Sequence, residues 1–382
     1  MASVHSAPSQ RLVSLQQLRG VAVLLVLILH VINVVDFRVF SGTDSAPGFI
    51  STWLNFNQFG SCGVDFFFVI SGFVMALLLQ GDGPPSQADF LYTRFVRIVP
   101  FFWTAALFYT LLSLAVGRNL PADQLLANIL IVPHSLFRFD LPVLVVGWSL
   151  AFELAFYLLV ASVLRLKRPA TSLSLLLLFL VGLSVARRPP PGVLAIMENP
   201  IQLEFLWGIA AHWLWRRLSS RRISEVAATG LIVLGAWFLG LQVVNGLHFD
   251  VDAMLIVSGL TSLYRAVLWG LPCASIVLGA VLLEAKLSAR GAVFRPFLRM
   301  TGDASYSLYL VHLPLCMLAE TQLPANALQA DLLIVALAIV CWGFGILVHR
   351  TLEVPMLKLL YQFRPGREGW KAILVPHASA VQ

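Results

Sequence analysis

Long runs of apolar residues alternate with short polar segments along almost the whole chain. A run of about 20 apolar residues is long enough to cross a bilayer as a helix, so each run predicts a transmembrane segment. The predicted spans are residues 14–35, 59–80, 98–117, 142–164, 171–186, 200–216, 226–245, 265–284, 304–321 and 331–350. The pattern therefore predicts an all-α integral membrane protein with about ten transmembrane helices.

These spans leave little sequence for a separate globular module. We expect a cytoplasmic N-terminal segment at residues 1–13, one membrane domain at residues 14–355 and a cytoplasmic C-terminal tail at residues 356–382. The first apolar run is not followed by a small-residue cleavage site, so the first helix should remain in the membrane.

The composition agrees with a multi-pass membrane protein. Of 382 residues, 59% are hydrophobic and 12% charged, and the mean hydropathy is +0.85. A soluble protein of this size could not bury so much apolar surface. The four cysteines show neither the spacing of a metal site nor that of a disulfide framework, so no metal site is expected.

The net charge of +7 arises from 26 Lys and Arg residues that gather mainly in short segments between the apolar runs. The positive-inside bias of membrane proteins explains this distribution, and we infer no nucleic-acid partner from it. When most basic segments are placed on one face, both termini lie in the cytoplasm, as expected for the inner (cytoplasmic) membrane. Arg187 and Arg188 are exceptions that this threading places outside, which leaves the boundaries near residues 171–200 open.

The first apolar run contains two ionisable residues, Arg19 and His30, eleven positions apart. Such groups are costly at membrane depth and are usually retained for function. Eleven residues of helix rise about 16 Å and make about three turns, so both side chains project to nearly the same side at different depths. Arg19 is predicted near the cytoplasmic surface and His30 deeper in the membrane.

Two carboxylates are predicted at a depth similar to that of His30. Asp65 lies in the second span and Glu153 in the fourth, and both spans enter from the outer face. A carboxylate that binds one ring nitrogen of a histidine fixes its tautomer and makes it a better general base. The alternative for each carboxylate is a satisfied buried polar group that holds helices together.

On the cytoplasmic side, Arg94 and Arg97 are spaced i and i+3 just before Pro100. Two guanidinium groups at this spacing share one side of a helix and can bind a phosphate or pyrophosphate. Arg19 could supply a third positive group, or its side chain could extend to the membrane surface. Ordinary positive-inside flanking is the alternative for the pair.

The ninth span carries a second imidazole, His312, two residues before the helix-kinking Pro314. Tyr306 and Tyr309 precede it and could hydrogen-bond within a polar lumen. A structural and a functional role for His312 are both open. The sequence has no Walker loop, no His-Glu-x-x-His pair and no Gly-x-Ser-x-Gly elbow, which disfavours a nucleotide-driven pump.

Taken in order, these segments resemble the acyltransferase 3 family of membrane-bound O-acyltransferases. The resemblance rests on Arg, ten residues, His at 19–30, Gly-Val-Asp-Phe-Phe-Phe-Val-Ile-Ser-Gly-Phe at 63–73, Arg-x-x-Arg-Ile-x-Pro at 94–100, Trp-Ser-Leu-x-x-Glu at 148–153 and Ser-Tyr-Ser-Leu-Tyr-Leu-Val-His at 305–312. Glu353 before Pro355 also fits the closing segment of the family. The segment at residues 15–20 and the Gly-Trp pair at 147–148 look most like its exopolysaccharide acetyltransferase branch.

The resemblance implies transfer of an acyl group, most often acetyl from acetyl-CoA, to a hydroxyl of an envelope or lipid-linked glycan. Under this hypothesis the chain needs no permanently bound cofactor, and its partners are acyl-CoA, the glycan acceptor and the bilayer. His30 would deprotonate the acceptor or carry the acyl group, with Glu153 or Asp65 orienting it. The expected residues for substrate or CoA binding are Arg19, Arg94, Arg97, Ser149, Tyr309 and His312.

Two alternatives stay open on the sequence. One is acyl transfer with succinyl or a longer acyl group, or to a small lipid or antibiotic acceptor. The other is a transporter or flippase, in which the same buried ionisable residues would line a solute or proton pathway.

Overall fold

A computed structural model describes residues 12–42, 48–54, 59–81, 85–131, 141–187, 193–219, 224–244, 253–259, 261–284, 294–319, 324 and 326–364. Most of the predicted N-terminal segment, most of the predicted C-terminal tail and Arg188 lie outside these residues. Within them the chain is helical and contains no strand, as the apolar pattern predicts.

The longer helices coincide with the predicted spans, except that α5 begins at Gln87, well before the span predicted at 98–117. They are α1 (Val13–Gly42), α4 (Cys62–Leu79), α5 (Gln87–Ala115), α7 (Gly147–Val163), α8 (Pro169–Ala186), α10 (Leu203–Ser219), α11 (Glu225–Val244), α14 (Leu271–Leu282), α17 (Ser305–Ala319) and α18 (Ala327–Val348). Shorter helices connect or extend them: α2 (Phe49–Leu54), α6 (Ala122–Leu130), α9 (Val193–Glu198), η1 (Pro200–Gln202), α12 (Ala253–Val257), α13 (Ser262–Arg265), η2 (Ala266–Gly270), α16 (Phe294–Asp303), η3 (His349–Glu353), α19 (Val354–Leu360) and η4 (Tyr361–Phe363).

Seven helical stretches in the described part of the chain are long and apolar enough to cross a membrane. They are Val13–Asp36, Cys62–Leu79, Gln87–Ala115, Pro169–Ala186, Glu225–Val244, Ser262–Leu282 and Ala327–Phe363. The remaining three predicted spans correspond to α7, α10 and α17, which have 17, 17 and 15 residues. A membrane protein is therefore confirmed, whereas ten full spans and the orientation of the termini stay predictions.

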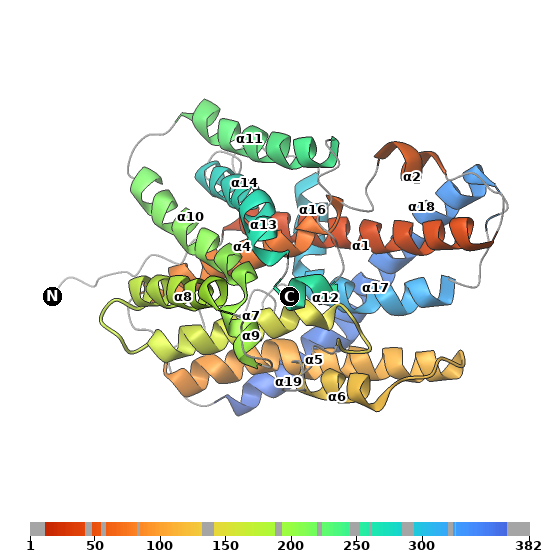
Figure 1. Cartoon of the computed structure of the whole chain (residues 1–382), viewed down its shortest axis with the longest axis horizontal. Helices are drawn as coiled ribbons and strands as arrows, with labels where there is room; N and C mark the ends of the chain where they lie inside the picture. The colour runs from red at the N-terminus through yellow and green to blue at the C-terminus, as the bar shows by residue number, and fades with distance from the viewer. Residues whose placement is uncertain are drawn as a thin grey trace, which may run out of the picture.

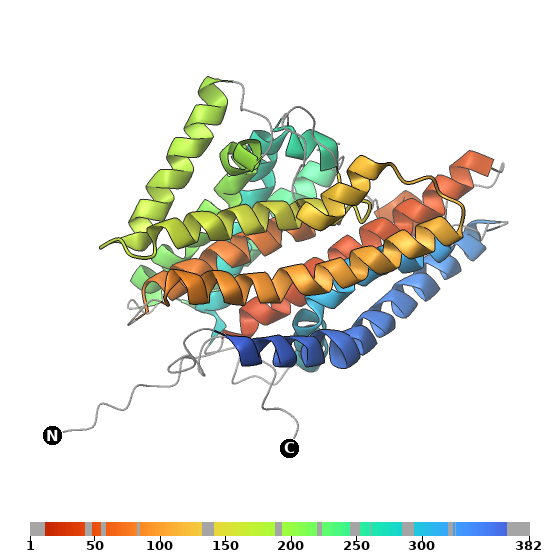
Figure 2. The ribbon, with the colours of Figure 1, turned by 90° about the horizontal axis from the view of Figure 1, so that it is seen from below.

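The helices form a bundle around α1 and α4 (Figures 1 and 2). α1 packs against α4, α16, α17 and α18, while α4 also packs against α10 and α14. α11 covers α14 at the upper edge of Figure 1, and α8 lies beside α7. The most apolar window of α4 is 78% buried, compared with 17% for α8 and 22% for α11, so α4 is central and the other two face outward.

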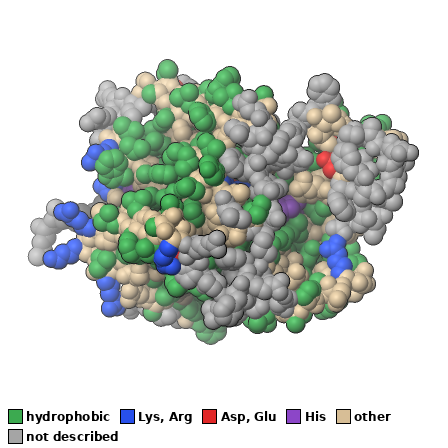
Figure 3. All heavy atoms as spheres, viewed as in Figure 1, with side chains coloured by type: hydrophobic (Ala, Val, Ile, Leu, Met, Phe, Trp, Pro, Cys, Tyr) green, Lys and Arg blue, Asp and Glu red, His purple; other side chains and the backbone are tan. Residues whose placement is uncertain are grey.

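Apolar side chains cover much of the described part of the face shown in Figure 3. In this view most of the Lys and Arg side chains gather at the left-hand end of the molecule. Exposed large apolar residues occur along the outward helices α8 and α11, including Leu175, Phe179, Leu234 and Trp237. The outer surface is thus suited to lipid rather than to water.

Glycines allow the central helices to approach closely. A Cβ atom on Gly72 of α4 would overlap the backbone oxygen of Phe205, and one on Gly208 of α10 would overlap that of Val69. Small residues at such crossings let helix backbones touch, which is typical of membrane proteins. The α4–α10 contact therefore depends on these two positions having no side chain.

The last helical stretch continues past the predicted domain boundary at residue 355. α18, η3, α19 and η4 run without a break to Phe363. Arg364 then donates to both carboxylate oxygens of Asp89 at the start of α5, over 2.6 and 2.8 Å. This hydrogen bonding raises the pKa of the Arg364 guanidinium and fastens the end of the helical stretch to α5.

Candidate active site

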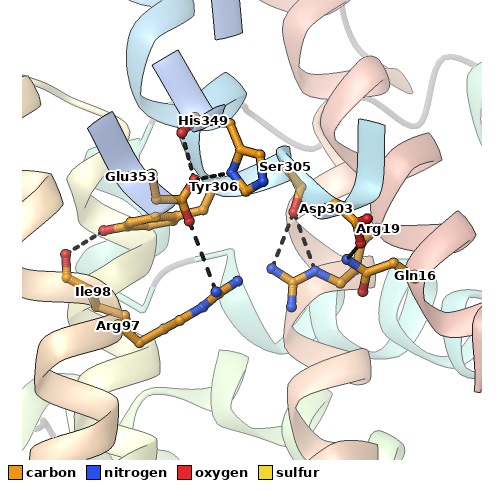
Figure 4. Close-up of polar contacts among 10 residues, drawn as sticks. Gln16, Arg19, Arg97, Ile98, Asp303, Ser305, Tyr306, His349 and Glu353 are labelled. Atoms are coloured by element: carbon orange, nitrogen blue, oxygen red, sulfur yellow. Dashed lines mark hydrogen bonds and ion pairs between the residues drawn. The ribbon is translucent and has the colours of Figure 1, made fainter. Parts of the chain in front are cut away.

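Two of the predicted arginines point into one space from different helices (Figure 4). Arg19 of α1 donates from Nε and Nη2 to Ser305 Oγ of α17, over 3.3 and 3.2 Å. Arg97 of α5 lies with its Nη1 atom 4.0 Å from Oε1 of Glu353. The guanidinium groups are close enough for their positive charges to repel each other, so the space between them favours an anion.

Glu353 is itself held firmly. Its Oε2 atom accepts a hydrogen bond of 2.6 Å from Ser307 and lies 2.7 Å from Nδ1 of His349. The η3 turn is a π-helix, which brings both His349 and Glu353 toward α17. Tyr306 donates to the backbone oxygen of Ile98 over 2.6 Å and thereby joins α17 to α5. These contacts fix the carboxylate that faces Arg97 (Figure 4).

Arg94 has no such acceptor in the described part of the chain. Its guanidinium lies over the rings of Phe90 and Tyr157, 5.3 and 5.2 Å from their centroids. Its Nε and Nη2 atoms are buried without a hydrogen-bond partner among the described residues. Buried donors are nearly always satisfied, and a guanidinium binds phosphate oxygens well. The free donors of Arg94 are therefore suited to an anionic ligand.

A cavity of about 490 Å³, a volume that includes space open to the outside, has Arg19 in its wall. Helices α1, α4, α7 and α17 contribute its walls. The lining residues are Arg19, Val64, Phe67, Phe68, Ile70, Ser71, Ser149, Leu150, Glu153, Ser305, Tyr306 and Tyr309. The cavity thus joins a positive end at Arg19 to a wall of hydroxyl groups, a carboxylate and aromatic rings.

Hydrogen bonds order the polar wall. Glu153 Oε1 accepts from Ser71 over 3.1 Å and from Tyr157 over 2.6 Å. The Tyr309 hydroxyl lies 2.7 Å from Ser149 Oγ and donates to the Val146 backbone oxygen over 3.0 Å. The ring of Tyr157 that stacks under Arg94 therefore also binds the carboxylate of the cavity. Arg94 is coupled in this way to Glu153.

His30 contacts a second imidazole rather than a carboxylate. Its Nδ1 atom lies 2.8 Å from the Val26 backbone oxygen and 3.2 Å from Nε2 of His312, and the ring centroids are 4.9 Å apart. Tyr309 lies between the cavity and this pair, with its ring centroid 6.3 Å from that of His312. The predicted contact of His30 with Glu153 or Asp65 is not present.

Asp65 instead binds Arg265, which the sequence analysis did not single out. Its two carboxylate oxygens accept from Nε and Nη2 of Arg265 over 3.1 and 2.6 Å, and both side chains are at most 1% exposed. Arg265 also donates to the Ser61 backbone oxygen over 2.9 Å. The pair joins α4 to α13, so its geometry is that of a buried structural ion pair.

Replacing Asp65 with asparagine is expected to destabilise the protein strongly, because the buried Arg265 guanidinium loses the carboxylate to which it is hydrogen-bonded. Breaking one side of a buried pair costs about 3–5 kcal/mol. The unfolding temperature of the purified protein in detergent should fall, and Arg265→Gln added to Asp65→Asn should restore part of the loss. Asp331→Asn is the control. The Asp331 carboxylate is partly exposed and accepts from the backbone N–H groups of Phe49 and Ile50 at the start of α2, so its replacement should cost less stability. If Asp65→Asn unfolds at the native temperature but no longer transfers the acyl group, Asp65 acts in the reaction and not in stability.

The structure brings together most, but not all, of the predicted site residues. Arg19, Ser149, Glu153 and Tyr309 line the cavity. Arg94 reaches its wall through Tyr157, and Arg97 faces Arg19. His312 is fully buried against His30, and Asp65 lies in the separate ion pair.

The sequence analysis missed three polar residues of this region: Ser71, Tyr157 and Ser305. Ser71 and Ser305 lie within the segments that carried the family resemblance, so the motifs already contained this signal. Tyr157, four residues after Glu153, could have been found from its place one helical turn further on. Within the described residues, no three His, Cys, Asp or Glu side chains converge as metal ligands.

Comparison with known proteins shows the family of the chain. Residues 12–348 match the acyltransferase domain of the acyltransferase 3 family. The chain is 32% identical over 309 residues to the exopolysaccharide production protein ExoZ of Rhizobium meliloti (strain 1021). This alignment covers 78% of this chain and 90% of ExoZ. It is 27% identical over 386 residues to acyltransferase MdmB of Streptomyces mycarofaciens, covering 93% and 94% of the two chains. No solved structure matches significantly.

An apolar helical bundle around a polar cavity, with these relatives, defines a membrane-bound acyltransferase. More specifically, the chain belongs to the acyltransferase 3 family, whose match extends over nearly all of the described helices.

Proposed function

We propose that the protein transfers an acyl group, acetyl in the first instance, from acyl-CoA to a hydroxyl of an envelope or exopolysaccharide glycan. The observation that carries this proposal is a polar cavity lined by Arg19, with Arg97 facing Arg19 and with buried donors on Arg94 that have no partner among the described residues. An anionic donor with a long, narrow arm suits such a site. The name of the relative ExoZ supports a polysaccharide acceptor.

The donor would bind through its phosphate groups. Arg19, Arg94 and Arg97 lie near the ends of their helices that the charge pattern assigns to the cytoplasm, where acyl-CoA is made available. Each guanidinium group can donate hydrogen bonds to two phosphate oxygens in a planar fork. The pantetheine arm would extend into the cavity past Phe67 and Tyr309, so that the thioester approaches the histidine pair. Acyl-CoA is then a co-substrate, and no resident cofactor is required.

His30 would act on the acceptor hydroxyl. As general base it removes the hydroxyl proton while the oxygen attacks the thioester carbonyl carbon. The carbon–sulfur bond breaks, the thiolate leaves, and the proton passes from His30 to the sulfur. The products are an O-acyl ester and free CoA. Transfer through a transient acyl-imidazole on His30 gives the same products by two steps and is the alternative route.

Ser149, Tyr309 and Glu153 would hold the reacting groups in the cavity. The Ser149 and Tyr309 hydroxyls can donate to a carbonyl oxygen on which charge develops, provided that their mutual hydrogen bond rearranges. Glu153 would bind sugar hydroxyls as an acceptor through Oε2, since Oε1 already accepts from Ser71 and Tyr157. Both termini would lie in the cytoplasm, and the protein in the inner membrane.

The test is acyl transfer by the purified protein in lipid. The protein is incubated with acetyl-CoA labelled in the acetyl group and a crude envelope-glycan fraction, and label released from the glycan by mild alkali is counted as O-ester. Protein-dependent, alkali-labile label in the glycan is expected. Parallel reactions use succinyl-CoA, longer acyl-CoA donors and small lipid or hydroxylated antibiotic acceptors.

If label is transferred only in those parallel reactions, the donor is not acetyl-CoA or the acceptor is not a glycan, and the assignment changes accordingly. Absence of both transfer and acyl-CoA binding, with solute movement across proteoliposomes, would contradict the proposal and favour a transporter.

A further inference from the structure

His30 and His312 form a direct imidazole pair between α1 and α17, and the hydrogen bonds around it restrict where their protons lie. His312 is fully buried, while His30 is partly exposed. Nε2 of His312 lies 3.2 Å from Nδ1 of His30. Each Nδ1 atom also lies close to the backbone oxygen four residues earlier in its own helix.

The proton of His312 is fixed first. Its Nδ1 atom lies 2.9 Å from the Leu308 backbone oxygen, which can only accept. A neutral imidazole carries one ring proton, so the proton sits on Nδ1 and Nε2 presents a lone pair. His312 therefore offers His30 an acceptor rather than a donor.

The proton of His30 follows from this. Its Nδ1 atom faces two acceptors, the Val26 backbone oxygen at 2.8 Å and Nε2 of His312 at 3.2 Å. A lone pair on Nδ1 would be repelled by both, whereas an N–H there donates to both. The proton thus lies on Nδ1 of His30, and the lone pair lies on Nε2, which makes no hydrogen bond to the described residues.

We propose that His312 is a positioning residue that holds His30 in the tautomer whose Nε2 atom can accept a proton. This inference rests on the proposed function, in which His30 is the general base. His312 would take the role that a carboxylate was expected to fill: it orients the imidazole and accepts from Nδ1–H as the ring becomes charged. Because His312 is buried, it would not contact the acyl-CoA donor or the glycan acceptor itself.

Two substitutions of similar size separate positioning from packing. A glutamine amide reaches about as far as Nε2 of the histidine that it replaces, and an asparagine amide reaches about as far as Nδ1. His312→Gln therefore keeps an acceptor for His30, whereas His312→Asn keeps only a donor for the Leu308 oxygen.

The kinetics of both variants are compared in lipid with labelled acetyl-CoA. Loss of a hydrogen bond to a charged group predicts that kcat falls about 10- to 100-fold in His312→Asn. His312→Gln should stay within about threefold of the native kcat, and the KM for the donor should change little in both variants, because the arginines are untouched. Equal kcat values for the two variants would overturn the inference.

A second readout does not depend on activity. Nitrogen-15 spectra of histidine-labelled protein show which ring nitrogen bears the proton, and the His30 signals are identified by their loss in His30→Ala. We expect a protonated Nδ1 and a bare Nε2 on His30; a proton on Nε2 in the native protein would overturn the inference even if no transfer is detected. If His30→Ala is inactive but His312→Asn and His312→Gln are equally active, the positioning role fails and the proposed function stands.

Discussion

Replacement of His30 by alanine is expected to lower the rate of acyl transfer by about 10²–10⁴-fold, the range that general-base catalysis contributes. The reason is that no neighbour can replace its Nε2 atom. His312 is fully buried, and its own Nδ1 proton is committed to the Leu308 backbone oxygen. The rate is measured with labelled acetyl-CoA and the glycan fraction under saturating donor.

Binding of the donor should be nearly unchanged in His30→Ala. His30 lies eleven residues, or about 16 Å of helix, from Arg19, so the proposed phosphate site is left intact. Acetyl-CoA binding is measured by titration calorimetry on the same preparation. Normal transfer by His30→Ala would refute the catalytic assignment, and lost binding together with lost transfer would indicate that the variant disturbs the bundle.

His212→Phe is the matched control for removing a buried histidine. His212 of α10 packs against Phe73 and Trp215, with ring centroids 5.1 and 5.7 Å away. Neither of its ring nitrogens has a hydrogen-bond partner among the described residues. A phenyl ring can therefore fill the same space, and transfer by His212→Phe should remain close to native.

The sequence could predict the depth of the polar residues but not the direction in which each points. Hydrophobic runs locate a residue along a helix, and they place His30, Asp65 and Glu153 in one layer. Contact also needs the rotation of each helix about its axis and the identity of its neighbours. α4 turns Asp65 toward Arg265 of α13, and α17 places His312 beside His30. One sequence contains no information about that rotation.

Arg265 shows a second limit of hydropathy. It lies at the first position of a predicted span, where basic residues are normally read as surface flanks. In the structure the preceding residues Ser262–Tyr264 already belong to the same helical stretch, and Arg265 is 1% exposed. A π-helical segment at Ala266–Gly270 follows directly. Composition cannot show that a residue at a span edge has a buried partner 200 positions earlier.

The motif segments predicted the cavity better than the individual roles within it. Arg19, Ser149, Glu153 and Tyr309 come from three separate segments, and all four line one cavity. Their shared location follows from helix packing, whereas their hydrogen bonds depend on side-chain conformation. The bond between Tyr157 and Glu153 of α7 is an example, because through the Tyr157 ring it links the cavity to Arg94 of α5.

Replacement of Arg94 by glutamine is expected to raise the KM for acyl-CoA about 10- to 100-fold, because a hydrogen bond to a charged group contributes about 1.5–3 kcal/mol. The value of kcat should change much less, since Arg94 is placed at the phosphate end of the donor. Initial rates are measured over a range of acetyl-CoA concentrations. The ring stacking on Phe90 and Tyr157 is partly kept by the glutamine side chain, so the fold should persist.

Arg94→Lys distinguishes a planar fork from simple positive charge. Lysine keeps the charge but cannot bind two phosphate oxygens in one plane or stack in the same way. An intermediate KM is therefore expected for Arg94→Lys. Arg350→Gln is the control, because Arg350 is an exposed cation on η3 that does not line the cavity. An equal rise in KM for Arg350→Gln would mean that the donor responds to overall surface charge and not to a site at Arg94.

The same variants can identify which phosphate Arg94 binds. Acetyl-dephospho-CoA lacks the 3′-phosphate but keeps the pyrophosphate and the thioester. If Arg94 binds the 3′-phosphate, its replacement should raise the KM for acetyl-CoA but not that for the dephospho donor. If it binds the pyrophosphate, both KM values should rise together. Because the buried Nε and Nη2 atoms of Arg94 have no acceptor among the described residues, one of these two patterns is expected, and unchanged KM values for both donors would refute the phosphate site.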